Sequence, residues 1–336
     1  MTRLRVGIVS WNTAPLLDRC LASLPAALEG VDAEVVVVDN ASSDDSALVA
    51  GSHPNVRLER NAVNVGYATA MNQALGGASA DVLVALNPDT EVGPGALAGL
   101  SRRLLEQPGV GLVVPRLRNV DGTLQHSVYP FPTLTHAALL CFVPPALLRL
   151  TGCGPRWWLE GLSPHDRPAD IDWAIGAVHV LRADAVDPVR PYSERWFMYV
   201  EDLDLCWRLS RAGWRRRFEP DFEVVHVGNA AGAQAWGDMR TERWLAASYE
   251  WYAEARGERS LRVWAAINGA GVGWMAFRHA LPGLIAPRRW PQSRKLARQF
   301  GRLARLHARA AVRGRPPIGP MPDAVTGTQA QGPQAT

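Results

Sequence analysis

Lysine is almost absent from this chain of 336 residues, which contains only Lys295. A P-loop places a lysine directly after a glycine-rich turn to hold nucleotide phosphates, so a P-loop site is excluded. No G-x-G-x-x-G sequence follows the first predicted strand, which excludes a Rossmann dinucleotide site. The glycine-rich stretch at residues 269–273 comes too late in the chain to open such a unit, and we interpret it as helix packing or a bend.

Cysteine is also scarce, and long apolar runs are missing. None of the four cysteines forms a C-x-x-C pair, so neither a disulfide framework nor a thiolate zinc site is indicated. Polar residues and a proline interrupt residues 264–286, which makes them a poor transmembrane span. The first ten residues are broken too soon by polar side chains for a signal peptide and predict a buried strand instead. These absences favour a location in the cytoplasm.

Positive charge is concentrated near the C-terminus. Residues 288–315 contain ten basic residues and no acidic one, so the net charge of +4 conceals a mildly acidic remainder of the chain. Apolar anchors precede this basic stretch, which favours an anionic membrane surface at the inner face of the membrane over nucleic acid. The predicted anchors are Trp264, Trp274, Phe277, Leu281 and Leu284.

The alternative for this region is a C-terminal helix that packs on the rest of the protein. We therefore divide the chain into a catalytic domain over residues 1–257, an amphipathic and basic helical region over 258–315, and a disordered tail over 316–336.

Short β-rich runs alternate with helical patterns through the first half of the chain. The predicted strands are residues 4–9, 33–38, 56–59, 81–86 and 110–114, and the helices between them include 16–28, 67–75 and 96–106. This order predicts a doubly wound α/β sheet, in which ligands bind beyond the carboxyl ends of the strands. Polar residues follow each of the first four predicted strands, and they begin with Ser10, Asp39, Asn61 and Asn87.

An acidic run opens a predicted helix at residues 201–208, with three carboxylates and an arginine. At helical spacing Asp202 lies on a different face from the other two carboxylates and the arginine. Taken alone, such a run is a solvated helix start that the helix dipole favours. Together with Asn87-Pro88-Asp89 and His226, it indicates a site in which a bound metal faces a general base.

Six segments, in order, resemble the successive motifs of glycosyltransferase family 2, and the bacterial rhamnosyltransferase-like subgroup of cell-envelope polysaccharide synthesis is the most similar. They are residues 35–46, 64–72, 86–89, 172–177, 201–214 and 225–228, within a resemblance that covers about residues 4–255. The resemblance implies a GT-A fold, which is a Rossmann-like doubly wound mixed sheet. It also implies a nucleoside-diphosphate sugar donor, a Mg²⁺ or Mn²⁺ ion, and single-displacement transfer that inverts the anomeric centre.

The same resemblance assigns residues to the donor side. Asp39 accepts the N3–H of uracil or thymine, or else it caps the turn that follows it. Trp11 and its neighbours contact the nucleotide, or Trp11 is a core aromatic residue. The 64–72 segment lines the donor pocket, or it shapes a turn and caps a helix. The predicted donor-side residues are Ser10, Trp11, Asn12, Asp39, Asn64, Gly66, Asn72, Asn87, Asp89 and Arg208.

The metal ligands predicted from the resemblance are Asp89 and His226. Asp89 keeps the last carboxylate of an Asp-x-Asp motif, whereas Asn87 replaces a charged ligand by a neutral carbonyl, so the metal affinity is expected to be modest. The alternatives are a structural Asn-Pro-Asp turn and a histidine that belongs to the core.

On the acceptor side, Asp202 is the predicted general base, and Glu201 is its rival or hydrogen-bonds sugar hydroxyls. Arg208 with Asp204 buttresses the helix or helps to hold the diphosphate. The acceptor segment comprises Asp172, Trp173, Gly176 and Ala177, and residues 131–170 match no motif and are interpreted as an acceptor loop.

The predicted function is transfer of rhamnose from dTDP-rhamnose to a glycan or lipid-linked glycan in cell-envelope polysaccharide synthesis. One alternative is a galactofuranosyl- or hexosyltransferase that uses a UDP-sugar. The other is a catalytically silent sugar-nucleotide-binding protein, against which the presence of Asp89, Asp202 and His226 argues.

Overall fold

The computed structural model describes residues 2–150, 165–228, 240–285 and 290–314. These residues belong to two compact units, one built from residues 1–131 and 164–240 and the other from 132–163 and 241–320. Compared with the predicted boundary after residue 257, the second unit begins earlier and includes part of the 131–170 segment. The predicted disordered tail, residues 316–336, lies outside the described residues.

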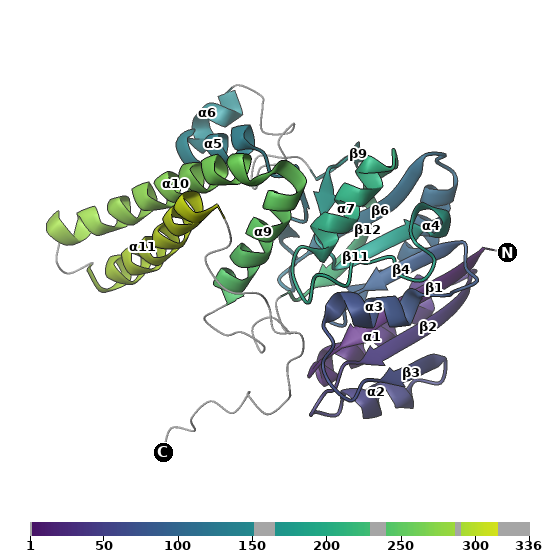
Figure 1. Ribbon diagram of the computed structural model, residues 1–336. Coiled ribbons are helices and arrows are strands. Elements are labelled where there is room, and N and C mark those ends of the chain that lie inside the picture. The colour runs from purple at the N-terminus through teal and green to yellow at the C-terminus, as the bar shows by residue number, and fades with distance from the viewer. Residues whose placement is uncertain (1, 151–164, 229–239, 286–289, 315–336) are drawn as a thin grey trace, which may run out of the picture. The chain divides into compact units, whose positions relative to one another are not determined.

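The first unit is built on one large mixed sheet (Figure 1) with strand order β3-β2-β1-β4-β11-β6-β12-β5, to which β7 and β9 add at β6 and β12, whereas β8 and β10 pair in a separate two-stranded sheet. Strand β1 pairs in parallel with β2 and β4, whereas β11 runs antiparallel between β4 and β6. The strands are β1 (Arg3–Ser10), β2 (Asp32–Asp39), β3 (Val56–Arg60), β4 (Val82–Leu86), β5 (Thr90–Val92), β6 (Val110–Arg118), β7 (Leu124–Gln125), β8 (Val128–Tyr129), β9 (Ala169–Asp170), β10 (Trp173–Ala174), β11 (Val178–Arg182) and β12 (Arg215–His226). The predicted α/β class is confirmed.

Helices cover this sheet where apolar side chains recur at helical spacing. One core joins the buried aliphatic residues of β1, β2, β4 and β6 to the apolar faces of α1 and α4. Every residue of β4 is buried, as expected for a central strand that is covered on both faces. The helices of this unit are α1 (Ala14–Ala27), α2 (Ser46–Ser52), α3 (Tyr67–Leu75), α4 (Ala96–Leu105) and α7 (Glu201–Arg211), with a short 3₁₀ turn at Ala183–Ala185.

Helix α3 packs on β1 at Gly7. A Cβ atom at Gly7 would lie 2.8 Å from Leu75 Cδ2 and 2.9 Å from Ala74 Cβ, closer than Cβ atoms approach other atoms. Gly7 alternates along β1 with Val6 and Ile8, which belong to the core shared with α1 and α4. Helix α3 therefore covers the opposite face of the sheet, and the missing side chain at Gly7 sets its distance.

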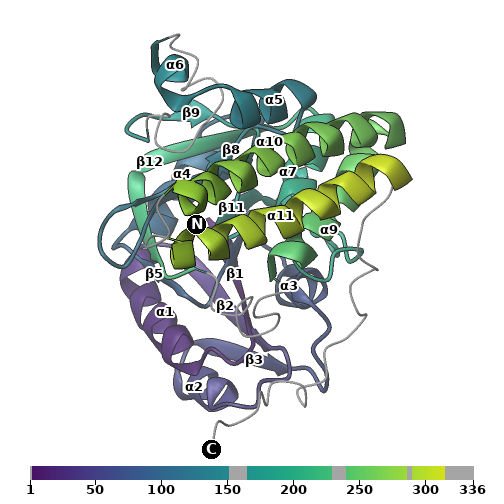
Figure 2. The same cartoon turned by 90° about the vertical axis from the view of Figure 1, so that its left-hand side faces the viewer.

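The second unit is helical. Figure 2 shows α10 and α11 side by side as two long helices, and α5 packs against α10. Glycines permit these approaches, because a Cβ atom at Gly271 would lie 2.3 Å from Cys141 Sγ on α5, and one at Gly269 would lie 3.2 Å from His307 Cβ on α11. The helices are α5 (Leu134–Phe142), α6 (Pro145–Leu150), α9 (Arg240–Arg256), α10 (Glu258–Ile285) and α11 (Trp290–Arg313).

Two expectations about this region need revision. The segment that was interpreted as an acceptor loop contains two helices, α5 and α6. The sequence did not reveal them, because prolines and the high apolar content of residues 134–150 obscure the helical period. Trp264, a predicted membrane anchor, stacks on Tyr252 with ring centroids 4.6 Å apart and packs inside the unit. Within the described residues, no helix combines the length and the apolarity that crossing a membrane requires.

The contact at Gly7 leads to a stability prediction. Gly7→Ala should lower the free energy of unfolding by about 1–3 kcal/mol, because the added methyl group overpacks the β1–α3 contact. Urea denaturation followed by circular dichroism measures the change. Gly51→Ala is the matched control, since Gly51 lies exposed on α2 with nothing within 4 Å of an added Cβ atom. If both variants unfold at the wild-type urea concentration, the close packing of α3 on β1 is contradicted.

Candidate active site

The ends of β1 and β2 are joined by side chains of the loops that follow them. Ser10 and Asp39 are register partners, and the Asn40 backbone N–H donates to the Ser10 carbonyl at 2.8 Å. Asn12 adopts a left-handed conformation (φ 53°), and its Oδ1 accepts from the backbone N–H of Ser43 at 2.7 Å. This geometry explains the choice of asparagine, which tolerates positive φ and bonds neighbouring backbone.

Two buried polar atoms in this region have no hydrogen-bond partner within the described residues. They are Asp39 Oδ1 and Trp11 Nε1, on side chains that are almost completely buried. The other carboxylate oxygen of Asp39 lies 3.9 Å from Arg60 Nε, and the Arg60 side chain is largely exposed. Since buried polar atoms are nearly always paired in folded proteins, each of these atoms could bond to a ligand, Asp39 Oδ1 to a donor and Trp11 Nε1 to an acceptor.

The polar residues of the 64–72 segment are engaged in shaping the fold. Asn64 Oδ1 accepts from the backbone N–H of Gly66 at 3.0 Å, and Asn72 brackets the backbone of Tyr192 with two hydrogen bonds of 2.9 Å. Gly66 has φ +85°, and a Cβ atom there would lie 2.6 Å from the Phe197 carbonyl oxygen. These contacts agree with the turn-shaping alternative, and the donor-pocket role of Asn64, Gly66 and Asn72 stays a prediction.

Asp89 and His226 come together at the end of β4 and β12. Asp89 Oδ1 lies 3.3 Å from His226 Nε2, and both side chains are buried. The backbone fixes this pair, because His226 is the register partner of Thr90 and the Val227 N–H donates to the Asp89 carbonyl at 2.9 Å. His226 Nδ1 bonds to Gln125 Oε1 at 2.7 Å, whereas Nε2 has no hydrogen-bond partner in the described part of the chain.

This pair fits a divalent cation. A carboxylate oxygen and an imidazole nitrogen that both offer lone pairs repel each other unless a cation or a proton lies between them, and both are ligands for Mn²⁺ or Mg²⁺. Three or more His, Cys, Asp or Glu residues that could hold a metal are not grouped anywhere among the described residues. Asn87 lies half-buried two residues before Asp89. With so few protein ligands, a bound ion would keep positions for diphosphate oxygens and water.

Glu201 and Asp202 begin helix α7 after two residues in the left-handed region, Tyr199 (φ 71°) and Val200 (φ 60°). Asp202 Oδ2 accepts from the Gly176 N–H at 3.0 Å, and Oδ1 accepts from the Leu203 N–H at 2.7 Å. Glu201 Oε2 is buried without a partner within the described residues. A β-branched residue at positive φ is rare, so the backbone is strained where the acidic pair is placed.

Burial raises the pKa values of the Glu201 and Asp202 carboxyl groups by different amounts. Burial raises the pKa of Asp202 to about 6, and the hydrogen bonds from the Leu203 and Gly176 amides oppose this rise. Burial together with the adjacent Asp202 charge raises the pKa of Glu201 to about 8. Because the adjacent Asp202 charge raises the pKa of Glu201 further, Asp202 ionises more readily than Glu201 and is the better proton acceptor of the two.

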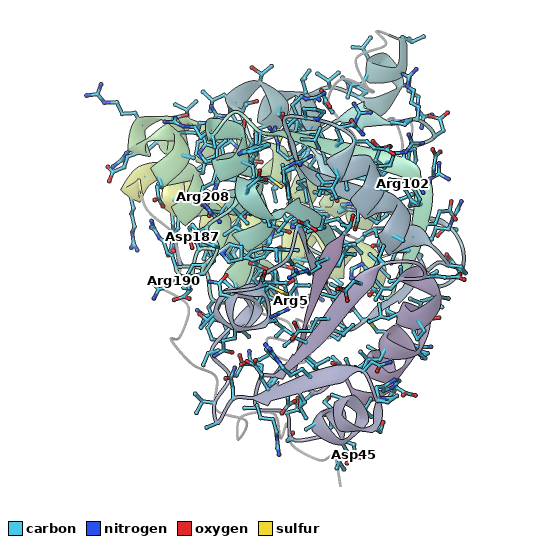
Figure 3. All side chains as sticks on the ribbon, turned by 90° about the vertical axis from the view of Figure 1, so that its right-hand side faces the viewer. Arg5, Asp45, Arg102, Asp187, Arg190 and Arg208 are labelled. Carbon is cyan, nitrogen blue, oxygen red and sulfur yellow. The ribbon has the colours of Figure 1, made fainter. Side chains whose placement is uncertain are left out.

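Arg208 serves the protein framework. Its Nε donates to Asp204 Oδ2 at 2.9 Å, and its guanidinium also donates to the Pro191 carbonyl at 2.7 Å. Figure 3 shows Arg208 near Asp187 and Arg190, which belong to the segment that it holds. These contacts agree with the buttressing alternative for Arg208, and its role at the diphosphate stays a prediction.

The predicted acceptor segment, residues 172–177, contacts both the start of α7 at Asp202 and the loop that carries Asp89. Asp172 Oδ2 accepts from the Phe131 N–H at 2.8 Å, and the Trp173 ring stacks on Tyr129 with centroids 4.9 Å apart, so one face of the indole is covered. The N–H of Gly176 binds Asp202, and the carbonyl of Ala177 accepts from the Asn87 N–H at 3.0 Å. Two consecutive residues thus connect the start of α7 to the loop that carries Asp89.

Sequence reasoning missed four polar residues near these groups. Tyr67 has a buried hydroxyl without a partner among the described residues, and the Glu201 and Asp202 charges, after burial, raise its pKa. Tyr192 OH lies 3.1 Å from His179 Nδ1, and burial lowers the pKa of His179 to about 4. Gln125 contacts His226 from a strand of only two residues, which leaves no periodic signal in the sequence. Of these four residues, only Tyr67 lies within one of the six family motifs, the segment 64–72.

Comparisons with known proteins identify the family of this chain. Residues 5–143 match the family described as Glycosyl transferase family 2. The chain is 33% identical over 244 residues to N-acetylglucosaminyl-diphospho-decaprenol L-rhamnosyltransferase of Mycobacterium tuberculosis, an alignment covering 66% of this chain and 75% of that protein. It is 37% identical over 59 residues to rhamnosyltransferase WbbL of Escherichia coli, covering 18% and 22% of the two chains.

Among solved structures, the mannosyltransferase PcManGT from Pyrobaculum calidifontis, in complex with GDP-Man and Mn²⁺, aligns with a TM-score of 0.55 at 17% identity, over 93% of this chain and 87% of that one. A likeness at this identity concerns the fold, which is the GT-A fold. The family match and the long alignment with the mycobacterial enzyme concern the sequence as well. The chain therefore belongs to glycosyltransferase family 2.

Proposed function

We propose that this glycosyltransferase is an inverting, metal-dependent enzyme that transfers a sugar from a nucleoside diphosphate to a hydroxyl group of a glycan. The observation that supports this best is the connection of two sites through Gly176 and Ala177. One site is the Asp89–His226 pair, whose facing lone pairs suit a cation, and the other is the buried Asp202. A transferase of this kind needs a charged leaving group at the first and a proton acceptor at the second.

In the proposed reaction, Asp202 accepts the proton of the acceptor hydroxyl while the oxygen of that hydroxyl forms a bond to the anomeric carbon. The bond between this carbon and the diphosphate oxygen breaks, and the electron pair leaves with the diphosphate. Asp89 and His226 would hold a Mg²⁺ or Mn²⁺ ion, which would supply charge neutralisation to that leaving group when bound. Glu201, whose pKa is raised by burial and by the Asp202 charge, hydrogen-bonds a sugar hydroxyl.

The proposed donor is dTDP-rhamnose. Asp39 Oδ1 is bare and buried, and it suits the N3–H of thymine or uracil, so the base alone does not choose between dTDP- and UDP-sugars. The mycobacterial relative, by its name, transfers L-rhamnose to a diphospho-decaprenol carrier of N-acetylglucosamine, and this favours rhamnose and a lipid-linked acceptor. A UDP-dependent hexosyl- or galactofuranosyltransferase is the second candidate, and a donor panel separates the two.

We further propose that the second unit binds the anionic surface of a membrane from the cytoplasmic side. Exposed basic residues of α11 recur at positions 294, 298, 305 and 309, a spacing that places them on one face of the helix. Exposed apolar side chains on α10, Val263, Trp274 and Phe277, share one face of that helix by the same spacing rule. Arginine and aromatic side chains on helices are the groups that bind lipid headgroups and the interface below them. The side chains of Leu281 and Leu284, also predicted as anchors, lie outside the described residues.

The role of Asp202 is tested by Asp202→Asn, which removes the proton acceptor and keeps the size of the side chain. Turnover should fall by roughly 10²- to 10⁴-fold, the usual contribution of general-base catalysis, while the Kd for nucleoside diphosphate stays near that of the wild type. Wild-type turnover should fall as the pH is lowered through about 6, because protonated Asp202 cannot accept a proton. Glu201→Gln keeps a hydrogen-bond donor and should cost less. A larger loss in Glu201→Gln than in Asp202→Asn would exchange the two roles.

Metal dependence is tested by Asp89→Ala and by chelation. Both should abolish nucleoside-diphosphate release from the donor, because the leaving charge stays uncompensated, while circular dichroism shows an intact fold. Asp18→Ala is a suitable control, since Asp18 is an exposed carboxylate on α1 that pairs with His53. Full turnover in excess EDTA would rule out the metal site.

Membrane binding is tested with the full chain and vesicles of phosphatidylglycerol. Charge reversal of Arg298, Arg305 and Arg309 to glutamate should release the protein from these vesicles, and salt should weaken binding of the wild type. Arg102 and Arg103 on α4 are exposed too, so their reversal to glutamate in the first unit is the control. Equal co-sedimentation of both variants and the wild type would contradict the proposed surface.

A further inference from the structure

Gln125 holds His226 on the side away from Asp89. Gln125 Oε1 lies 2.7 Å from His226 Nδ1, and its amide nitrogen donates to the His226 carbonyl at 3.3 Å. A glutamine oxygen only accepts hydrogen bonds, so this contact requires the proton of a neutral imidazole to lie on Nδ1. Which nitrogen carries that proton therefore depends on how the Gln125 amide is oriented.

Two acceptors fix the orientation of the Gln125 amide, namely the His226 carbonyl oxygen, which can only accept, and Asn119 Oδ1. The amide nitrogen of Gln125 donates to Asn119 Oδ1 at 2.9 Å, and the amide nitrogen of Asn119 donates to Thr123 Oγ1 at 2.9 Å. The Thr123 hydroxyl in turn donates to Asp121 Oδ1 at 2.6 Å. These residues belong to the hairpin between β6 and β7, in which the Asn119 N–H donates to the Thr123 carbonyl at 2.9 Å.

This series of hydrogen bonds can run in only one direction. An ionised carboxylate has no proton to donate, and the Thr123 hydroxyl, followed by the Thr123 amide, lowers the pKa of Asp121. Thr123 must therefore donate to Asp121 and accept from Asn119. Asn119 must then present its oxygen to Gln125, and Gln125 must present its oxygen to His226.

We propose that the Asp121–Thr123–Asn119–Gln125 series, the tautomer relay, sets the tautomer of His226, with the proton on Nδ1 and a bare Nε2 that faces Asp89. The inference rests on the metal site of the proposed function and assigns Gln125 as a positioning residue for it. Metal-ligating histidines bind through one nitrogen and donate a proton from the other to a fixed acceptor, and that acceptor orients the ring. Here the acceptor is the side-chain amide of Gln125, which is held in turn by the exposed turn at residues 119–123.

Histidine nitrogen NMR on the metal-free protein tests the relay directly. In alkaline buffer, where a histidine side chain is neutral, the spectrum of ¹⁵N-histidine-labelled enzyme should show the His226 proton on Nδ1. His179 is an internal reference with the opposite tautomer, because its Nε2 lies 3.1 Å from the Ala174 carbonyl and must donate to it. His226→Gln identifies the signals of His226. A proton on Nε2 of His226 in the wild type would overturn the proposal.

Variants of the relay separate its effect from simple loss of structure. Thr123→Val keeps the shape of the side chain but removes the hydroxyl, so Asn119 no longer restrains Gln125 and the second His226 tautomer should become detectable, although the His226 carbonyl still favours the wild-type orientation of the Gln125 amide. Thr123→Ser should behave as the wild type. Gln125→Glu needs no relay to present an oxygen, so it should keep the Nδ1 proton even when combined with Thr123→Val. An unchanged tautomer in Thr123→Val alone would show that the relay does not set it.

The consequence for the metal is measured by Mn²⁺ electron paramagnetic resonance in the presence of UDP. Gln125→Leu should weaken Mn²⁺ binding by about 10- to 100-fold, the usual effect of removing the partner of a ligating histidine. An unchanged Mn²⁺ affinity in this variant would overturn the positioning role. If wild-type protein binds no Mn²⁺ while the NMR result holds, the metal of the proposed function fails and the relay stands.

Discussion

The arrangement of this site depends on two neighbouring peptide groups, those of Gly176 and Ala177. The first donates its N–H to Asp202, and the second accepts from the N–H of Asn87. They immediately precede β11, which runs antiparallel between two strands of the parallel part of the sheet. Because β11 pairs with β4 through all five of its residues, the peptide groups that bind the acidic start of α7 and the Asp89 loop are fixed to the sheet.

Much of the fold follows from local chemistry that can be read along the chain. The aliphatic runs of β1, β2 and β4 and the helical periods of α1, α3 and α4 were predictable, because these elements are buried in a regular way. The convergence of Asp89 and His226 was predictable only through the family resemblance, since they are far apart in sequence and meet through the pairing of β5 with β12.

Other parts of the site carried no sequence signal that physics alone could use. Gln125 lies on a two-residue strand, and its importance comes from one contact across the sheet to His226. Asn64 and Asn72 were assigned to the ligand from the resemblance, yet their amides bond to the Gly66 turn and to the Tyr192 backbone. These contacts agree with a role in shaping the site, which the sequence offered as the alternative, and the role of both residues at the donor stays a prediction.

The left-handed pair Tyr199 and Val200 has a consequence for how this enzyme can change. Such a backbone costs about 1–3 kcal/mol per residue, and it persists because the segment before it is anchored, with the Phe197 carbonyl accepting from the Tyr67 N–H at 2.7 Å. Glycine at position 200 would relieve the strain and would also give the start of α7 freedom to move. The strained backbone at Val200 therefore couples the stability of this segment to the placement of Glu201 and Asp202, the two residues that follow it.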